Sequence, residues 1–240
     1  MSGRAVRSDA SARLCAMHQP NFFPWMGYFD KVRRSDVFVF LDAVSYPKSG
    51  NSMGSWCNRV RIDVQGKPSW LGCAVKREHG QQKICDVLID DERPWRAKLL
   101  KTLAMNYRRS ANFARAMEVI EPLVLNAETR LAEFNMHAIE MICRVLGVRG
   151  RLVRQTELPM HRQATGLLID ITKAMGCNTY LCGGGAQEYQ QDEQFAREGV
   201  RLEHQNFSPQ PYREPERFIP GLSVIDYLMH APAEQLHENN

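Results

Sequence analysis

Two short apolar runs near the start of the chain are separated by a polar stretch that contains two prolines. The runs lie at 13–17 and 37–41, and neither alternates with polar residues. Continuous runs of this length are typical of strands that are covered on both faces of a sheet. Pro20 and Pro24 exclude a helix before Trp25, because proline lacks an amide donor and restricts the residue before it. The pattern predicts two buried strands joined by a long connection.

A short amphipathic helix is predicted from Gly27 onward, inside that connection. Apolar side chains fall on one side of the helix and charged side chains on the other. The apolar side carries Tyr28, Phe29 and Val32, and the charged side carries Asp30, Lys31, Arg33 and Arg34. A strand, a loop, a helix and a second strand in this order usually form a right-handed parallel crossover.

The rest of the chain alternates between strand-like and helix-like spacing of its apolar residues. Gly147 and Gly176 are predicted to end helices. The predicted strands are 59–64 and 69–75 as a β-hairpin, then 84–89, 151–154, 179–182 and 200–204; the predicted helices are three within 95–146, then 165–175, 193–198 and 223–229.

These elements predict an α/β fold with a parallel-sheet, Rossmann-like core, a β-hairpin and a helical middle segment at about 93–147. We expect one domain at 13–232, with a disordered tail at 1–12 and a second tail at 233–240.

Composition narrows the class of protein. The net charge of +4 suits an anionic small ligand and does not require nucleic acid. The seven cysteines are odd in number and scattered, which predicts reduced thiols and a cytoplasmic location. No apolar run approaches the roughly 18 residues that a membrane span needs, and no signal peptide is expected. His137 and His161 have no ligand spacing to a second His or Cys, so no metal site is predicted.

Four polar side chains follow the two apolar runs directly. His18, Gln19 and Asn21 come after the first predicted strand, and Asp42 comes after the second. Open parallel sheets bind ligands beyond the carboxyl ends of their strands, so a site is expected at this edge. His18 titrates near neutrality and is a candidate base. The alternative is structural: His18 and Gln19 bond loop carbonyls, and Asp42 starts a turn.

Cationic and amide side chains lie on a polar loop and on the strand that follows it. Lys48 is in the loop, Asn58 precedes the strand, and Arg59 and Arg61 share one face of it, because side chains alternate along a strand. Guanidinium groups suit phosphate or carboxylate. The alternative is a solvated outer face of the hairpin.

Glycines follow the predicted strand at 179–182. Gly183 and Gly184 let backbone amides approach an anion. Cys182 could act as a nucleophile only with a base such as His18 within hydrogen-bond reach. A glycine-rich ligand loop without covalent chemistry is the alternative.

The chain resembles the WbqC-like proteins along nearly its whole length, in blocks that keep one order. The matching blocks are 18–20, 23–29, 36–42, 56–62, 180–185 with Tyr189, and 218–226. Tyr189 and Asp226 enter the candidate site through this resemblance alone, and Asp226 could equally pair with a cation or cap a turn. Many relatives have paired aspartates where this chain has Asp42 and Ala43, and serine where it has Cys182.

The resemblance implies a setting among genes for O-antigen and other surface polysaccharides, and a glycine transferase acting on a sugar amine. We therefore expect an acyl or aminoacyl transferase that acts on an amine of an activated sugar or small metabolite. His18 would be the base, Asp42 would orient the amine or His18, and Arg59 with Arg61 would hold an anionic handle. The substrate is expected to bear phosphate, and the donor could be an acyl carrier or an aminoacyl-tRNA.

Two other functions stay open. The opening unit is loosely similar to nucleotidylyltransferases and class I synthetases, which implies an ATP-dependent ligase or nucleotidylyltransferase using ATP with magnesium. The second histidine of that superfamily is missing, and Gly27 is followed by Tyr28. The other function is a non-catalytic module that binds a carrier protein or an RNA.

Overall fold

The structure is a computed structural model that describes residues 12–47, 55–76, 80–183 and 192–232. Five parallel strands form the main sheet in the order β5-β2-β1-β6-β7. They are β1 Leu14–His18, β2 Val37–Phe40, β5 Arg151–Arg154, β6 Thr179–Cys182 and β7 Arg201–His204. The predicted α/β fold with a parallel sheet is confirmed.

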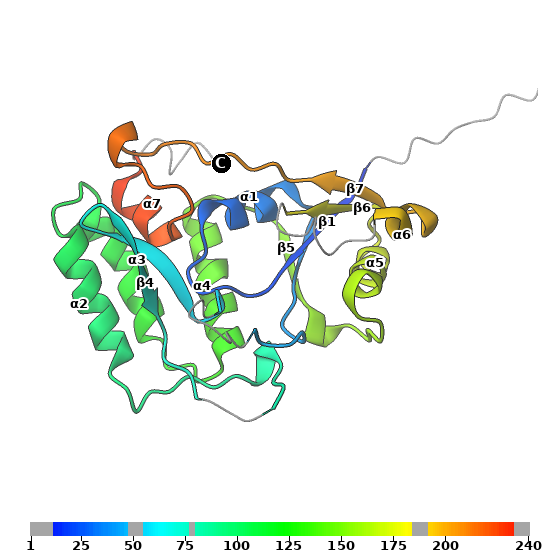
Figure 1. The fold of residues 1–240 in the computed structure, drawn as a ribbon, viewed down its shortest axis with the longest axis horizontal. Coiled ribbons are helices and arrows are strands. Elements are labelled where there is room, and N and C mark those ends of the chain that lie inside the picture. The colour runs from blue at the N-terminus through cyan, green and yellow to red at the C-terminus, as the bar shows by residue number, and fades with distance from the viewer. Residues whose placement is uncertain (1–11, 48–54, 77–79, 184–191, 233–240) are drawn as a thin grey trace, which may run out of the picture.

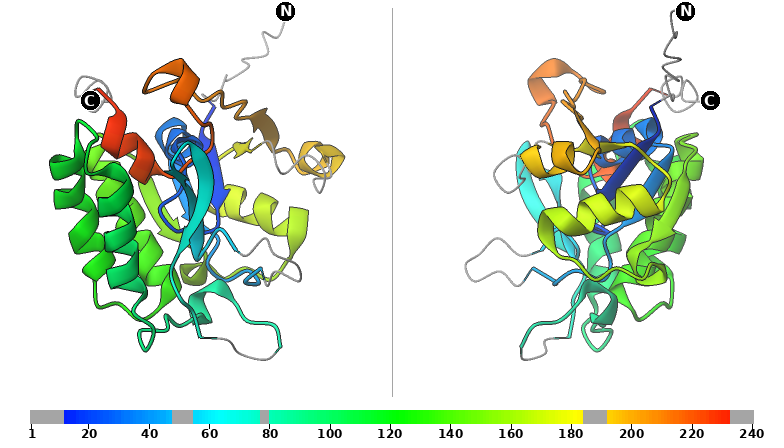
Figure 2. Two further views of the ribbon diagram at one scale, coloured as in Figure 1. Left: turned by 60° about the vertical axis from the view of Figure 1, so that its left-hand side comes forward. Right: turned by 90° about the vertical axis from the view of Figure 1, so that its right-hand side faces the viewer.

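Helices cover both faces of this sheet (Figures 1 and 2). They are α1 Met26–Arg34, α2 Trp95–Tyr107, α3 Phe113–Leu125, α4 Leu131–Val145, α5 Ala164–Ala174, α6 Asp192–Arg197 and α7 Val224–His230. Cys15 and Met17 of β1 pack with α5 and α6, whereas Ala16 packs in a core with α1, α4 and the remaining helices. This alternation explains why the buried strands have continuous apolar runs.

The strand order places a topological switch point between β1 and β6. The connection from β1 to β2 contains α1 on one face, and the connection from β6 to β7 contains α6 on the other face. Two neighbouring strands whose connections run in opposite directions have a crevice between their carboxyl ends. In doubly wound folds the ligand binds in this crevice.

The hairpin of β3 Arg59–Val64 and β4 Lys67–Gly72 forms a separate antiparallel sheet. It packs beside α7 and the loop after β1, where Ser223 N donates to Arg61 O at 2.8 Å. The predicted hairpin is therefore confirmed, with a second strand that begins and ends earlier than 69–75.

The predicted strand at 84–89 is wrong. Residues Ile84–Asp86 form a 3₁₀ turn, and Leu88 and Ile89 form only isolated bridges. Ile84 and Val87 are both fully buried, because side chains three apart point the same way from such a turn. These apolar side chains therefore pack in the core, although the segment is not a strand.

Two glycines end helices as expected. Gly147 after α4 and Gly176 after α5 have φ of 64° and 66°, a left-handed conformation that glycine adopts at little cost. All seven cysteines are described and form no disulfide. No helix in the described ranges is long and apolar enough to cross a membrane.

Candidate functional site

The carboxyl ends of β1 and β6 stop pairing at the switch point. β1 pairs with β2 as far as His18, and β6 pairs with β7 as far as Cys182, but pairing between β1 and β6 ends at Ala16 and Leu181. We call this end of the ladder the β1–β6 fork. Gly183 follows β6 directly, so the histidine and the first glycine lie at one edge. Gly184 and Tyr189 lie outside the described residues.

Lys31 of α1 reaches this fork, although the helical pattern placed it on the charged side. Its side chain is buried, with 4% exposed, and its Nζ donates to Met17 O at 3.0 Å. A Cβ atom built on Gly183 would lie 3.6 Å from the same Nζ. The ammonium group therefore lies between the ends of the two strands, just beyond their last paired residues.

Burial lowers the pKa of both Lys31 and His18, and the charge of Lys31 lowers that of His18 further. Burial lowers the pKa of Lys31 to about 8. Burial, and then the positive charge of Lys31, lower the pKa of His18 to about 3. His18 Nδ1 lies 3.2 Å from Gln19 O, an acceptor, so Nδ1 carries the hydrogen and Nε2 keeps its lone pair. At neutral pH His18 is thus a neutral acceptor beside a cation.

Buried side chains hold the loop after β1 in place. Tyr28 is buried, and its hydroxyl donates to Gln19 O at 3.1 Å. The Cys57 thiol lies 3.6 Å from Gln19 Oε1 and 3.8 Å from Oδ1 of Asn21, which is 2% exposed. These three predicted site residues, Gln19, Asn21 and Tyr28, lie near His18 and make hydrogen bonds within the protein.

Asn135 of α4 joins this loop to the segment just before the hairpin. Asn135→Ala is expected to lower the free energy of unfolding by about 2 kcal/mol. Its buried Nδ2 donates to Pro20 O at 2.9 Å and to Cys57 O at 2.7 Å, so the variant removes a donor from two carbonyl groups. Urea unfolding measures the change. His137→Ala on the exposed side of the same helix is the control, and a loss as small as the control's would contradict the prediction.

Asp42 lies at the same edge but on its other side. It is 1% exposed, and its two carboxylate oxygens accept from Thr156 N at 3.0 Å and Thr156 Oγ1 at 2.7 Å. Thr156 follows β5, so Asp42 fastens the end of β5 to β2. No hydrogen bond joins Asp42 to His18 within the described ranges, and its catalytic role stays a prediction.

A run of aromatic rings leads from His18 to the hairpin. The Trp25 ring lies 5.7 Å from the His18 ring and 5.9 Å from the Trp56 ring, and Trp56 lies 5.1 Å from Trp70. Gly27 is needed here, since a Cβ atom would lie only 2.6 Å from Trp25 Nε1. Trp56 and Trp70 are 37% and 42% exposed, so the far end of the run is open to ligands.

The two arginines of β3 lie on these indole rings. The guanidinium carbon of Arg59 lies 4.4 Å from the Trp70 ring centre, and that of Arg61 lies 5.6 Å from the Trp56 ring centre. Both arginines therefore share one face of the strand. We call Trp25, Trp56, Trp70, Arg59 and Arg61 the Trp–Arg surface; the three tryptophans were not among the predicted site residues.

Two further predicted residues do not join this surface. Asn58 bonds within the protein, because its Nδ2 donates to Cys73 O at 3.1 Å and its Oδ1 accepts from the Tyr46 hydroxyl at 2.9 Å. Lys48 lies outside the described residues. Asn58 therefore fixes the base of the hairpin.

Cys182 is enclosed and has a different imidazole partner from the one considered. Its thiol is fully buried and lies 3.2 Å from His204 Nδ1, on the neighbouring strand β7. Burial raises the pKa of the Cys182 thiol, which keeps it protonated. A protonated thiol without exposure is poorly suited to covalent catalysis.

Asp226 belongs to a separate buried cluster. It is fully buried and accepts from the Tyr107 hydroxyl at 2.9 Å and the Tyr212 hydroxyl at 2.7 Å, and Arg213 Nη1 lies 3.8 Å away. These partners lie on α2 and on the segment before α7, away from the sheet edge. The resemblance alone therefore links it to the site.

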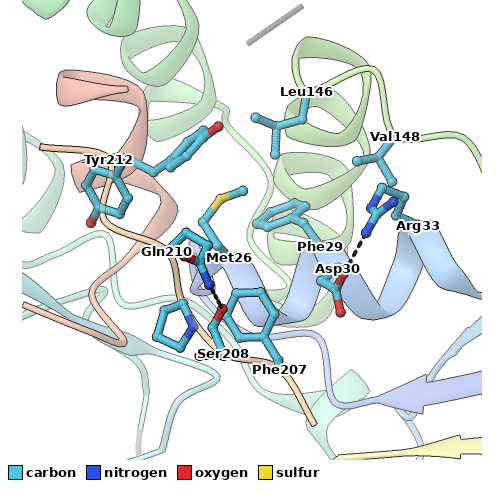
Figure 3. Close-up of a pocket in the computed structure, with 12 residues that line it drawn as sticks. Met26, Phe29, Asp30, Arg33, Leu146, Val148, Phe207, Ser208, Gln210 and Tyr212 are labelled. Atoms are coloured by element: carbon cyan, nitrogen blue, oxygen red, sulfur yellow. Dashed lines mark hydrogen bonds and ion pairs between the residues drawn. The ribbon is translucent and has the colours of Figure 1, made fainter. Parts of the chain in front are cut away.

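An apolar cavity of about 290 Å³ lies between α1, the end of α4 and the segment 207–212 (Figure 3). Met26 and Phe29 point into it, and its charged residues Asp30 and Arg33 pair with one another at 2.9 Å. None of its lining residues is among those that the sequence predicted for the site. The sheet edge therefore remains the better candidate for chemistry. In the described part of the chain no three His, Cys, Asp or Glu side chains gather to hold a metal.

Comparisons with known proteins identify a family but no activity. The chain is 28% identical over 225 residues to "Uncharacterized protein Rv1507c" of Mycobacterium tuberculosis (strain ATCC 25618 / H37Rv), covering 91% of this chain and 94% of that protein. No solved structure matches the chain. Residues 19–238 match the family described as the WbqC-like protein family, and they include His18's loop, α1, the hairpin and β6. This protein therefore belongs to the WbqC-like protein family.

Proposed function

We propose that this protein is a transferase that moves an acyl or aminoacyl group, glycyl included, from an activated donor to an amine of an activated sugar or small metabolite. The observation that carries the proposal is the run of rings from His18 to the Trp–Arg surface. Indole faces suit a ring-shaped ligand, and guanidinium groups suit its phosphate or carboxylate. A substrate held this way extends its other end toward His18. The resemblance to the family suggests biosynthesis of a surface polysaccharide or specialised metabolite as the setting.

His18 is suited to align the amine. Its neutral Nε2 accepts an N–H bond of the amine, whose nitrogen then forms a bond to the carbonyl carbon of the donor. The bond from that carbon to the leaving group breaks, and the leaving group takes the proton of the amine. Because the pKa of His18 is about 3, the imidazole orients the amine rather than holding its proton.

Replacing His18 by Ala is expected to lower the rate of amide formation about 100-fold, the loss that a misplaced reacting group can cause. The probes are glycyl adenylate as donor and a uridine diphosphate amino sugar as acceptor, with the amide product measured by mass spectrometry. His161→Ala removes an exposed imidazole and is the matched control. An unchanged rate in His18→Ala, or no product from the unaltered protein, would count against the proposal.

An ATP-dependent ligase or nucleotidylyltransferase is the second candidate, and the strand order favours it. A switch point beside the first strand is where doubly wound folds bind nucleotides. Stabilisation by ATP with magnesium would support this function, because a ligand that binds the folded state raises the unfolding temperature. Amide formation from a preformed donor, without ATP, would support the transferase instead.

A further inference from the structure

Lys31 is a buried cation whose charge no carboxylate in the described ranges balances. Its ammonium group has three N–H donors, and the hydrogen bond to Met17 O uses one of them. The Tyr180 ring also lies near it, with its centre 5.9 Å from Nζ. Burying an ammonium group without a counter-ion is costly, so a partner of opposite charge would stabilise this arrangement strongly.

The space beside this ammonium is kept clear of a side chain. Gly183 stands where a Cβ atom would lie 3.6 Å from Lys31 Nζ and 3.9 Å from Gln205 Oε1. The position is the β1–β6 fork, where the ladder has ended and where doubly wound folds admit their ligands. A small anion approaching this edge meets the ammonium group and the neutral His18. Gln205 turns its amide oxygen to this point, because its Nε2 donates to Gly27 O at 2.6 Å and to Asp30 Oδ2 at 2.9 Å.

The titratable groups around the Lys31 ammonium in the described structure lie on α1 and on three strands. They are Cys15 and His18 on β1, Tyr180 and Cys182 on β6, His204 on β7, which lies 3.2 Å from the Cys182 thiol, and Asp30 on α1, which pairs with Arg33 at 2.9 Å. Burial raises the pKa of Tyr180 and Cys182, and the hydrogen bond with the Cys177 thiol together with burial raises that of Cys15, so these three groups are neutral at neutral pH. A bound anion would balance the charge of Lys31.

We propose that Lys31 and the β1–β6 fork form an oxyanion site that binds a phosphate group, distinct from the Trp–Arg surface. A lysine ammonium is a compact point charge, which suits a tetrahedral phosphate, and the absence of a guanidinium fork gives a planar carboxylate no bidentate partner. The assignment of that phosphate to the activated donor rests on the proposed function. The site itself does not, because an inorganic oxyanion probes it without turnover.

Sulfate is the probe, because its charge is constant between pH 7 and 9.5, and sodium chloride at matched ionic strength corrects for general salt effects. Titration calorimetry is expected to show that Lys31→Met lowers sulfate affinity at least tenfold, whereas Lys31→Arg retains it. Lys101→Met on the exposed side of α2 is the matched control and should leave affinity unchanged. Orthophosphate at pH 7 should bind like sulfate, and acetate should bind more weakly.

The pH dependence gives a second, independent arm. Sulfate affinity of the unaltered protein should fall about tenfold for each pH unit above 8, as Lys31 loses its proton, and that of Lys31→Arg should stay constant. Equal sulfate affinity in the unaltered protein and Lys31→Met, or no sulfate binding at all, would overturn the oxyanion site. Sulfate binding that depends on Lys31 without any amide formation would overturn the transferase alone.

Discussion

Asp226→Ala is expected to lower the free energy of unfolding by about 3 to 5 kcal/mol. The variant removes a carboxylate from the buried Arg213 cation and removes the acceptor of two buried hydroxyl groups. The Tyr107 and Tyr212 hydroxyls both donate to the Asp226 carboxylate. The Arg213 side chain is only 7% exposed and keeps Asp63 as its second carboxylate, at 2.9 Å. Urea unfolding followed by circular dichroism measures the loss.

Single Tyr107→Phe and Tyr212→Phe variants measure how much each hydroxyl group contributes to the free energy of unfolding. Each should cost about 1 kcal/mol, and each should cost less when Asp226 is already Ala, because the hydroxyl has then lost its acceptor. A fully stable Asp226→Ala protein that makes no amide would give Asp226 the functional role that the family resemblance implies. Reduced stability with a normal rate per folded molecule would assign it to the scaffold.

The strands of the sheet could be predicted because their signal is local. β1 and β2 are apolar at every central position, since both of their faces are covered, and a continuous run is visible in the sequence alone. The order of the strands is not local. β6 lies beside β1, and α5 packs on the opposite face from α1; both arrangements depend on contacts between segments far apart in the chain.

The candidate site shows the same division. His18 was predictable, because it directly follows a buried strand whose carboxyl end is a preferred place for ligands. Lys31 was not, since helical spacing assigned it to the charged side and only the folded chain brings its long side chain to Met17. The contacts between Trp25, Trp56 and Trp70 join three distant segments, and no periodicity records them.

Asp42 shows what local reasoning about polar groups leaves out. Its position after β2 suggests an available carboxylate, but Thr156 occupies both of its oxygens, and that partner lies 114 residues away. A polar residue at a strand end can therefore serve either the ligand or the neighbouring strand. Only the hydrogen-bond partners distinguish the two.

Lys31→Met is expected to be more stable than the unaltered protein at pH 7 when no anion is present. Lys31 has a pKa of about 8 in the folded protein, below the ordinary 10.5, so the unfolded chain binds the proton more tightly. Stability of the unaltered protein therefore rises with pH between about 8 and 10.5, where the unfolded state holds more protons. The advantage of Lys31→Met should shrink by about 2 to 3 kcal/mol between pH 7 and pH 10.

Urea unfolding of the two proteins at several pH values measures this difference, because groups that titrate alike in both proteins cancel. Lys101→Met, which loses an exposed lysine, should show no such trend. A difference that stays constant with pH would mean that Lys31 keeps an ordinary pKa and carries no burial penalty. Adding sulfate should reverse the ranking at pH 7, because the bound anion stabilises only the protein that retains the ammonium group. A residue that weakens the empty fold and strengthens the occupied one is kept for its ligand rather than for the fold.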